Sequence, residues 1–140
     1  MSTPPTLLFI PGSWHKPTCY DEVTKLLQGH KLKCISITLP STTGNPAATF
    51  KDDLETAREA ILTETINGRN VVVIAHSYGG MVGNSAIKGL TEPRDFTESQ
   101  NQTSTTGYVI GLILIASGFT LSGLAFMDPF FRPPPFLAGQ

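Results

Sequence analysis

The 140-residue sequence has few cysteines, no basic stripe and no apolar run long enough to span a membrane. Its two cysteines are too few for a disulfide framework, so Cys19 and Cys34 are expected to be reduced and buried. Ten basic and eleven acidic residues give a net charge of −1, which argues against nucleic acid or an anionic membrane as a partner. The composition is that of one globular domain.

The amino terminus resembles none of the usual targeting segments. Residues 1–5 contain no basic residue, and the apolar run at 7–10 is short and ends at Pro11, so neither a signal peptide nor a membrane span is expected. The sequon that begins at Asn101 is interpreted as a chance match, because no secretory signal accompanies it. With its reduced cysteines, the chain is predicted to be cytoplasmic.

Short apolar runs alternate with helical patterns along the chain. Strands are predicted at 6–10, 32–38, 70–75 and 108–116, and helices at 18–28, 50–66 and 78–90. The strands are apolar throughout, which is typical of a parallel sheet that helices cover on both faces. The predicted fold class is therefore α/β, with a parallel sheet of about four strands flanked by helices.

The helix predictions depend on capping residues and apolar spacing. Thr49 is expected to cap helix 50–66, with Asp52 and Asp53 in the first turn, where carboxylates interact favourably with the helix dipole. In helix 18–28 an apolar stripe is expected to pack on the sheet, namely Tyr20, Val23, Leu26 and Leu27. Each helix is thus predicted to bury one side.

A serine between small residues follows the third predicted strand. Residues 71–80 read Val-Val-Val-Ile-Ala-His-Ser-Tyr-Gly-Gly, which places Ser77 where a buried strand must turn sharply into a helix. Ala75 and Gly79 are small enough for such a turn and approach the pattern G-x-S-x-G of a nucleophile elbow. We interpret Ser77 as a nucleophile, because the alternative, an ordinary turn capped by serine, does not account for the paired glycines or for His76.

A second motif follows the first predicted strand. Residues 11–15 read Pro-Gly-Ser-Trp-His, a glycine-containing loop of the kind that presents backbone N–H groups to a developing oxyanion. In its order of strand, loop, helix, strand and elbow, the chain resembles the α/β-hydrolase superfamily, in particular the esterase and hydroxynitrile-lyase-like branch, whose loop usually reads His-Gly-x-Trp. Gly12 and Trp14 match that loop, whereas Pro11 replaces its histidine.

The resemblance implies a serine hydrolase that acts on small carboxylic esters, with Ser77 as the nucleophile. The oxyanion hole would then comprise the backbone N–H of Tyr78 and that of Ser13 or Trp14. The alternative for Trp14 is an aromatic side chain in the core or in the wall of the pocket. The sequence contains no metal-ligand cluster, phosphate-binding loop or dinucleotide fingerprint, so neither a metal nor another cofactor is expected.

The sequence has no histidine after the serine. In the family that it resembles, the catalytic acid and then the histidine follow the nucleophile, whereas here His15, His30 and His76 all precede Ser77. His76 is expected to point into the packing below the elbow. His15 and His76 are retained as residues that line the pocket or act as the base, with His15 the better placed.

The chain therefore resembles the N-terminal half of a hydrolase, a partial fold without the C-terminal strands that carry the rest of the triad. Residues 1–118 are predicted to form part of the core, and residues 119–140 the start of a lid or a Pro-rich tail. Three functions stay open: an esterase, a catalytically silent binding module, and half of a split enzyme. In the last case, the bare edge of strand 108–116 would bind a second copy or a partner chain.

Overall fold

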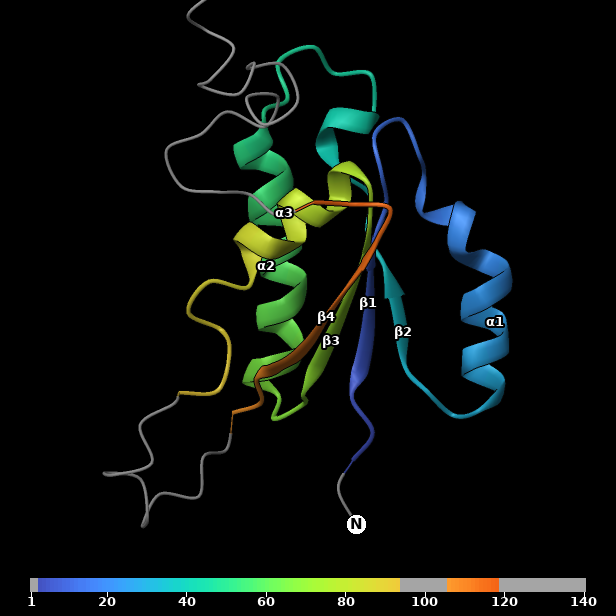
Figure 1. The fold of residues 1–140 in the computed structure, drawn as a ribbon, viewed down its shortest axis with the longest axis vertical. Helices are drawn as coiled ribbons and strands as arrows, with labels where there is room; N and C mark the ends of the chain where they lie inside the picture. The colour runs from blue at the N-terminus through green and yellow to red at the C-terminus, as the bar shows by residue number, and fades with distance from the viewer. Residues whose placement is uncertain (1–2, 94–105, 119–140) are drawn as a thin grey trace, which may run out of the picture.

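A parallel sheet lies at the centre of the structure, a computed structural model that describes residues 3–93 and 106–118. Its strands are β1 (Thr6–Ile10), β2 (Cys34–Ser36), β3 (Val71–His76) and β4 (Val109–Ile115). They lie in the order β2-β1-β3-β4, and each neighbouring pair is parallel (Figure 1). The predicted fold class is confirmed. The segment 119–140, predicted as a lid or tail, lies outside the described residues.

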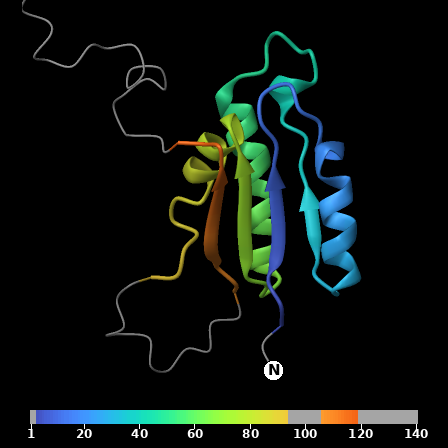
Figure 2. The ribbon, with the colours of Figure 1, turned by 45° about the vertical axis from the view of Figure 1, so that its right-hand side comes forward.

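Helices lie on both faces of the sheet (Figures 1 and 2). One face carries the short helix η1 (Pro17–Tyr20) and α1 (Asp21–Gly29), and the other carries α2 (Phe50–Ile66) and α3 (Tyr78–Ala86). A second short helix, η2 (Pro40–Thr42), follows β2. The carboxyl ends of the parallel strands, and the loops that follow them, therefore share one end of the sheet, which is where open α/β sheets bind ligands.

The core lies between the sheet and helices α2 and α3. Successive side chains of a strand point to opposite faces, so alternate residues of β1 and β3 enter this layer. Fully buried side chains of the layer include Leu8, Ile10, Val73, Ile61 and Val82. The face that α2 and α3 cover is therefore the well-packed one.

Helix α2 begins and ends where the sequence predicts. The Asp52 carboxylate accepts a hydrogen bond of 2.7 Å from the Thr49 backbone N–H, and Thr49 Oγ1 accepts one of 3.4 Å from the Asp52 N–H, which makes a capping box. The two apolar ends of α2, Phe50 and Ile66, are 40% and 68% exposed. The buried side of the helix includes Asp53 near its start.

The face that carries α1 is less well covered than predicted. No residue of α1 is buried, and Val23 and Leu26 are 41% and 70% exposed. The helix lies over the edge strand β2, which is shorter than predicted and offers little surface to pack on (Figure 1). Cys19 is likewise exposed rather than buried, Cys34 is half-buried, and both are free thiols. In the described part of the chain, no helix is long and apolar enough to cross a membrane.

Candidate functional site

Ser77 occupies the sharp turn between β3 and α3, as predicted. Its backbone angles are φ 51° and ψ −123°, and a positive φ is unusual for any residue other than glycine. Three hydrogen bonds hold the turn: Ser77 N–H donates to Ile115 O at 3.0 Å, and Ser77 O accepts from Gly80 N–H at 2.9 Å and from Ser117 Oγ at 2.6 Å. The neighbouring strand and helix therefore keep Ser77 in this conformation.

Two glycines allow the loop after β1 to lie against this turn. A Cβ atom on Gly79 would lie 2.4 Å from Pro11 O, and one on Gly12 would lie 2.9 Å from His76 Nδ1 and 3.2 Å from Ser77 Cβ. These distances are shorter than ordinary van der Waals contacts. A side chain at position 79 would collide with backbone atoms, and one at position 12 would have to displace the His76 ring. The loop after β1 thus lies beside Ser77. The fully buried Ala75 below the turn meets the demand for a small residue there.

His15 and His76 both lie beside this loop. Their rings meet edge to face with centroids 5.6 Å apart. His76 is half-buried, and its ring borders Gly12, whose absent side chain leaves room for it. The exposed His15 has Nδ1 2.8 Å from Ser13 O, and a proton on Nδ1 that donates to this carbonyl leaves Nε2 free to accept one.

The residues predicted for the oxyanion hole differ in their surroundings. Tyr78 begins α3, so its backbone N–H lies at a helix N-terminus, where negative charge is stabilised. A tight turn, closed by His15 N–H to Gly12 O at 3.2 Å, places Trp14 at its third position with φ 60°. The Trp14 side chain is consequently 92% exposed, and the alternative that it fills the core or a pocket wall is wrong for the described residues. Ser13 is half-buried.

A buried carboxylate beside the elbow was not recognised in the sequence. Asp53, in the first turn of α2, is fully buried. Its Oδ1 accepts a hydrogen bond of 2.9 Å from Ser41 N–H, and its Oδ2 accepts from Ser41 Oγ at 2.6 Å and from the Tyr78 hydroxyl at 2.7 Å. The signal was available, because Asp53 precedes the buried Ala57 and Ile61 at intervals of four residues, on one face of the helix.

Asp53 also affects the chemistry of Tyr78. Burial raises the pKa of Tyr78 above its ordinary value of 10.0, and the hydrogen bond to Asp53 raises this pKa further. The hydroxyl therefore stays protonated at neutral pH and acts as a donor. The contact ties the residue after Ser77 to helix α2.

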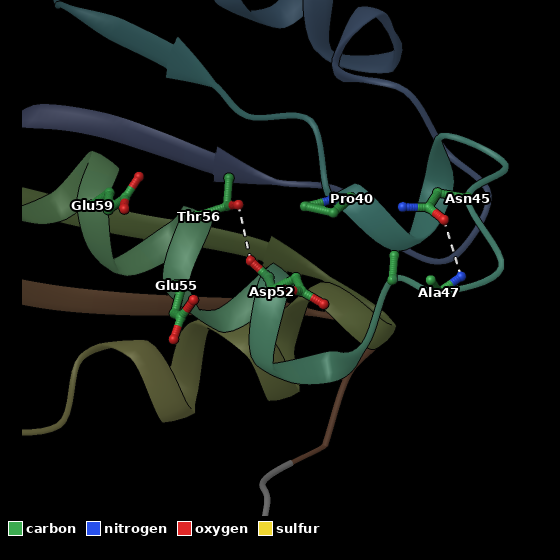
Figure 3. Close-up of a pocket in the computed structure, with 8 residues that line it drawn as sticks. Pro40, Asn45, Ala47, Asp52, Glu55, Thr56 and Glu59 are labelled. Carbon is green, nitrogen blue, oxygen red and sulfur yellow. Dashed lines mark hydrogen bonds between the residues drawn. The ribbon is translucent and has the colours of Figure 1, made fainter.

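A hollow of about 380 Å³ lies between α2 and the segment that precedes it (Figure 3). It is lined by the loop after η2 and by α2, through Pro40, Asn45, Ala47, Ala48, Asp52, Glu55, Thr56 and Glu59. Figure 3 shows the carboxylates of this lining spaced along the helix, and neither Ser77 nor Gly12 borders the hollow. We therefore do not assign it to the site at the elbow.

Comparisons with known proteins agree with the motifs. The family model described as "Alpha/beta hydrolase family" matches residues 7–140. Over 88 residues the chain is 31% identical to the alpha/beta hydrolase nvfD of Aspergillus novofumigatus, a match that covers 62% of this chain and 35% of that protein. Over 95 residues it is 32% identical to the probable hydrolase R7 of a Phoma species, a match that covers 66% of this chain and 39% of that protein. The chain thus spans little more than a third of the length of these relatives, and no solved structure matches it.

Proposed function

Because the chain belongs to the alpha/beta hydrolase family, we propose that it carries the nucleophile of a serine hydrolase that acts on small carboxylic esters. The observation that carries the proposal is the φ of 51° at Ser77, between a buried strand and a helix. Such a backbone conformation costs on the order of 1–3 kcal/mol and tends to persist at functional sites. The loop at 11–15 supports the finer assignment to the esterase and hydroxynitrile-lyase-like branch.

In the proposed reaction, Ser77 Oγ forms a bond to the carbonyl carbon of the ester. The carbonyl oxygen becomes an oxyanion, which the backbone N–H of Tyr78 and that of Ser13 or Trp14 would bind. The C–O bond to the alcohol then breaks, and the proton from the serine passes through a base to the leaving alkoxide. Water attacks the acyl-serine, which releases the carboxylic acid and restores Ser77.

The base is the weak part of this site. No histidine follows Ser77 in the sequence, and His15, through Nε2, is the candidate among the described residues. Loss of the general base from such a site costs on the order of 10⁴-fold or more in turnover. An oxyanion hole and substrate binding alone retain roughly 10³-fold acceleration over water. We therefore expect slow hydrolysis.

The test is hydrolysis of p-nitrophenyl acetate by the wild type and by Ser77→Ala. We expect a slow rate above that of buffer, which Ser77→Ala reduces to the buffer rate. Ser85→Ala, a second serine of α3, is the control and should keep the wild-type rate. An unchanged rate in Ser77→Ala would contradict the proposal.

A fast wild-type reaction would show instead that a base operates. His15→Ala then distinguishes the sources of that base: loss of the fast reaction assigns it to His15, and retention assigns it to another group. If the chain binds an ester analogue but Ser77→Ala changes no rate, it is a silent binding module.

A second candidate function, half of a split enzyme, is favoured by the outer strand of the sheet. β4 is an edge strand, and its Ile110, Ile113 and Ile115 are 53%, 50% and 46% exposed. Only its first residue is covered along this edge within the described ranges, through Val109 N–H to Leu90 O at 2.8 Å. We propose that this edge pairs with a strand of another chain: a different partner chain would supply the acid and the histidine, whereas a second copy would only cover the edge.

Sedimentation velocity over a range of protein concentrations tests pairing between copies. We expect the wild type to associate as the concentration rises, and a variant with Ile113→Lys and Ile115→Lys to remain monomeric. Ile66→Lys, which places the same charge on an exposed isoleucine of α2, should behave as the wild type does. A wild type that is monomeric throughout would rule out self-pairing and leave only a different partner chain.

A further inference from the structure

We infer that Asp53 is a positioning residue for the elbow, which through the Tyr78 hydroxyl fixes the residue whose backbone N–H would bind the oxyanion. This inference rests on the proposed function. Asp53 contacts none of the reacting atoms itself. Its partners are Ser41 and Tyr78, and Tyr78 directly follows Ser77.

The hydrogen bonds of Asp53 join three separate parts of the chain. Ser41 lies in η2 after β2, Asp53 lies in the first turn of α2, and Tyr78 is the first residue of α3. Both carboxylate oxygens are engaged, at distances of 2.6–2.9 Å, and the carboxylate is fully buried. A buried carboxylate with three donors has little freedom to reorient, so it holds these parts in register.

Tyr78 is consequently held on several sides. Its hydroxyl binds Asp53, its ring meets that of Phe50 edge to face with centroids 6.2 Å apart, and the next residue, Gly79, lies against Pro11 O. The contact with Asp53 therefore restricts how the Tyr78 backbone can move while its side chain stays in place. Since that peptide also follows the strained Ser77, the contact opposes relaxation of the turn.

An ordinary role for Asp53 at the helix N-terminus does not account for these contacts. The adjacent Asp52 already forms the capping box with Thr49. Asp53 instead turns toward the sheet end, where its hydrogen bonds leave α2 altogether. The two neighbouring aspartates thus have separable roles, and Asp52 provides a matched control.

The test combines backbone amide exchange with steady-state kinetics of p-nitrophenyl acetate hydrolysis in the full chain. Tyr78→Phe removes the hydroxyl and keeps the ring and the backbone N–H, and Asp53→Asn keeps the shape of the acceptor. We expect exchange of the Gly80 amide, which donates to Ser77 O, to accelerate in both variants about fivefold to tenfold more than that of Val73 in β3, which reports any loss of overall stability. kcat should fall and KM should change little, and Asp52→Asn should show neither effect.

Three results would be decisive. Unchanged Gly80 exchange and kcat in Tyr78→Phe, with activity that still depends on Ser77, would overturn the inference. Equal acceleration of exchange at Gly80 and Val73 would also overturn it, because it would show a general loss of stability. Faster Gly80 exchange alone, in a chain whose hydrolysis Ser77→Ala does not change, would support the anchoring of the elbow and contradict the proposed function. Tyr78→Phe decides the matter if Asp53→Asn does not fold.

Discussion

Helix α2 carries a buried carboxylate near each end, and the two have different kinds of partner. Asp53, at the carboxyl ends of the strands, accepts hydrogen bonds from the neutral groups of Ser41 and Tyr78. Glu64, at the opposite end of the sheet, is bound by cations. The two ends of one helix are thus attached to the sheet by different physical means.

The Glu64 end is an ion-pair cluster. Glu64 accepts a hydrogen bond of 2.6 Å from the buried hydroxyl of Thr6, and pairs with Lys33 Nζ at 2.6 Å and Arg69 at 3.3 Å. The side chains of Lys33 and Arg69 are 46% and 43% exposed, so water and salt can replace their contacts. This end tolerates changes of geometry, whereas the Asp53 end depends on directional hydrogen bonds to a buried group.

The largest expected change in stability comes from adding a methyl group at a crowded glycine, Gly79, and it is compared with the same change at an open one, Gly29. In Gly79→Ala the new Cβ would lie 2.4 Å from Pro11 O, a backbone atom that cannot move aside, and we expect a loss of roughly 3 kcal/mol in the free energy of unfolding. Gly29→Ala, at the end of α1, meets nothing within 4 Å and should gain about 0.5 kcal/mol. Urea unfolding measures both, and equal effects would contradict the contrast between a crowded and an open position.

A smaller effect is expected when each carboxylate becomes an amide. Asp53→Asn places an NH₂ group against donors, which we expect to cost about 2 kcal/mol. Glu64→Gln loses partly exposed ion pairs and should cost about 1 kcal/mol. In about 1 M NaCl the cost of Glu64→Gln should shrink and that of Asp53→Asn should not. The same salt dependence for both variants would contradict the distinction between ion pairs at Glu64 and neutral hydrogen bonds at Asp53.

The smallest effect concerns pH. Burial alone would raise the pKa of Glu64, but hydrogen bonds from Lys33, Thr6 and Arg69 outweigh it and lower the pKa below its ordinary value of 4.5. A carboxyl whose pKa is lower in the folded state stabilises the fold above 4.5, and this stability is lost as the pH falls through the folded-state pKa. Thermal unfolding of the wild type and Glu64→Gln should therefore converge in acid. A constant difference would contradict this role for Glu64.

Local patterns in the sequence were sufficient to predict the turn at Ser77 and the bounds of α2. The turn at Ser77 and the cap at Thr49 each depend on residues within a few positions along the chain, so their geometry can be predicted from the sequence. The position of Gly12 beside Ser77 is consistent with the parallel sheet, because the carboxyl ends of parallel strands meet at one end.

The remaining features depend on contacts between distant segments. The four-residue spacing of Asp53 from Ala57 and Ile61 places it on the buried side of α2, but its hydrogen-bond partners lie 12 and 25 positions away in the chain. The exposure of Val23 and Leu26 depends on how much sheet lies beneath α1, and the position of the His76 ring depends on the space beside Gly12. Sequence spacing alone specifies none of these.

The most direct test of the account is reaction with a fluorophosphonate, followed by peptide mapping of the label. A serine at an elbow without a strong base should react slowly and at one place, so we predict a single label on Ser77 that accumulates slowly and is absent in Ser77→Ala. A label on another residue, or the same extent of labelling in Ser77→Ala, would contradict the claim that this turn presents the nucleophile.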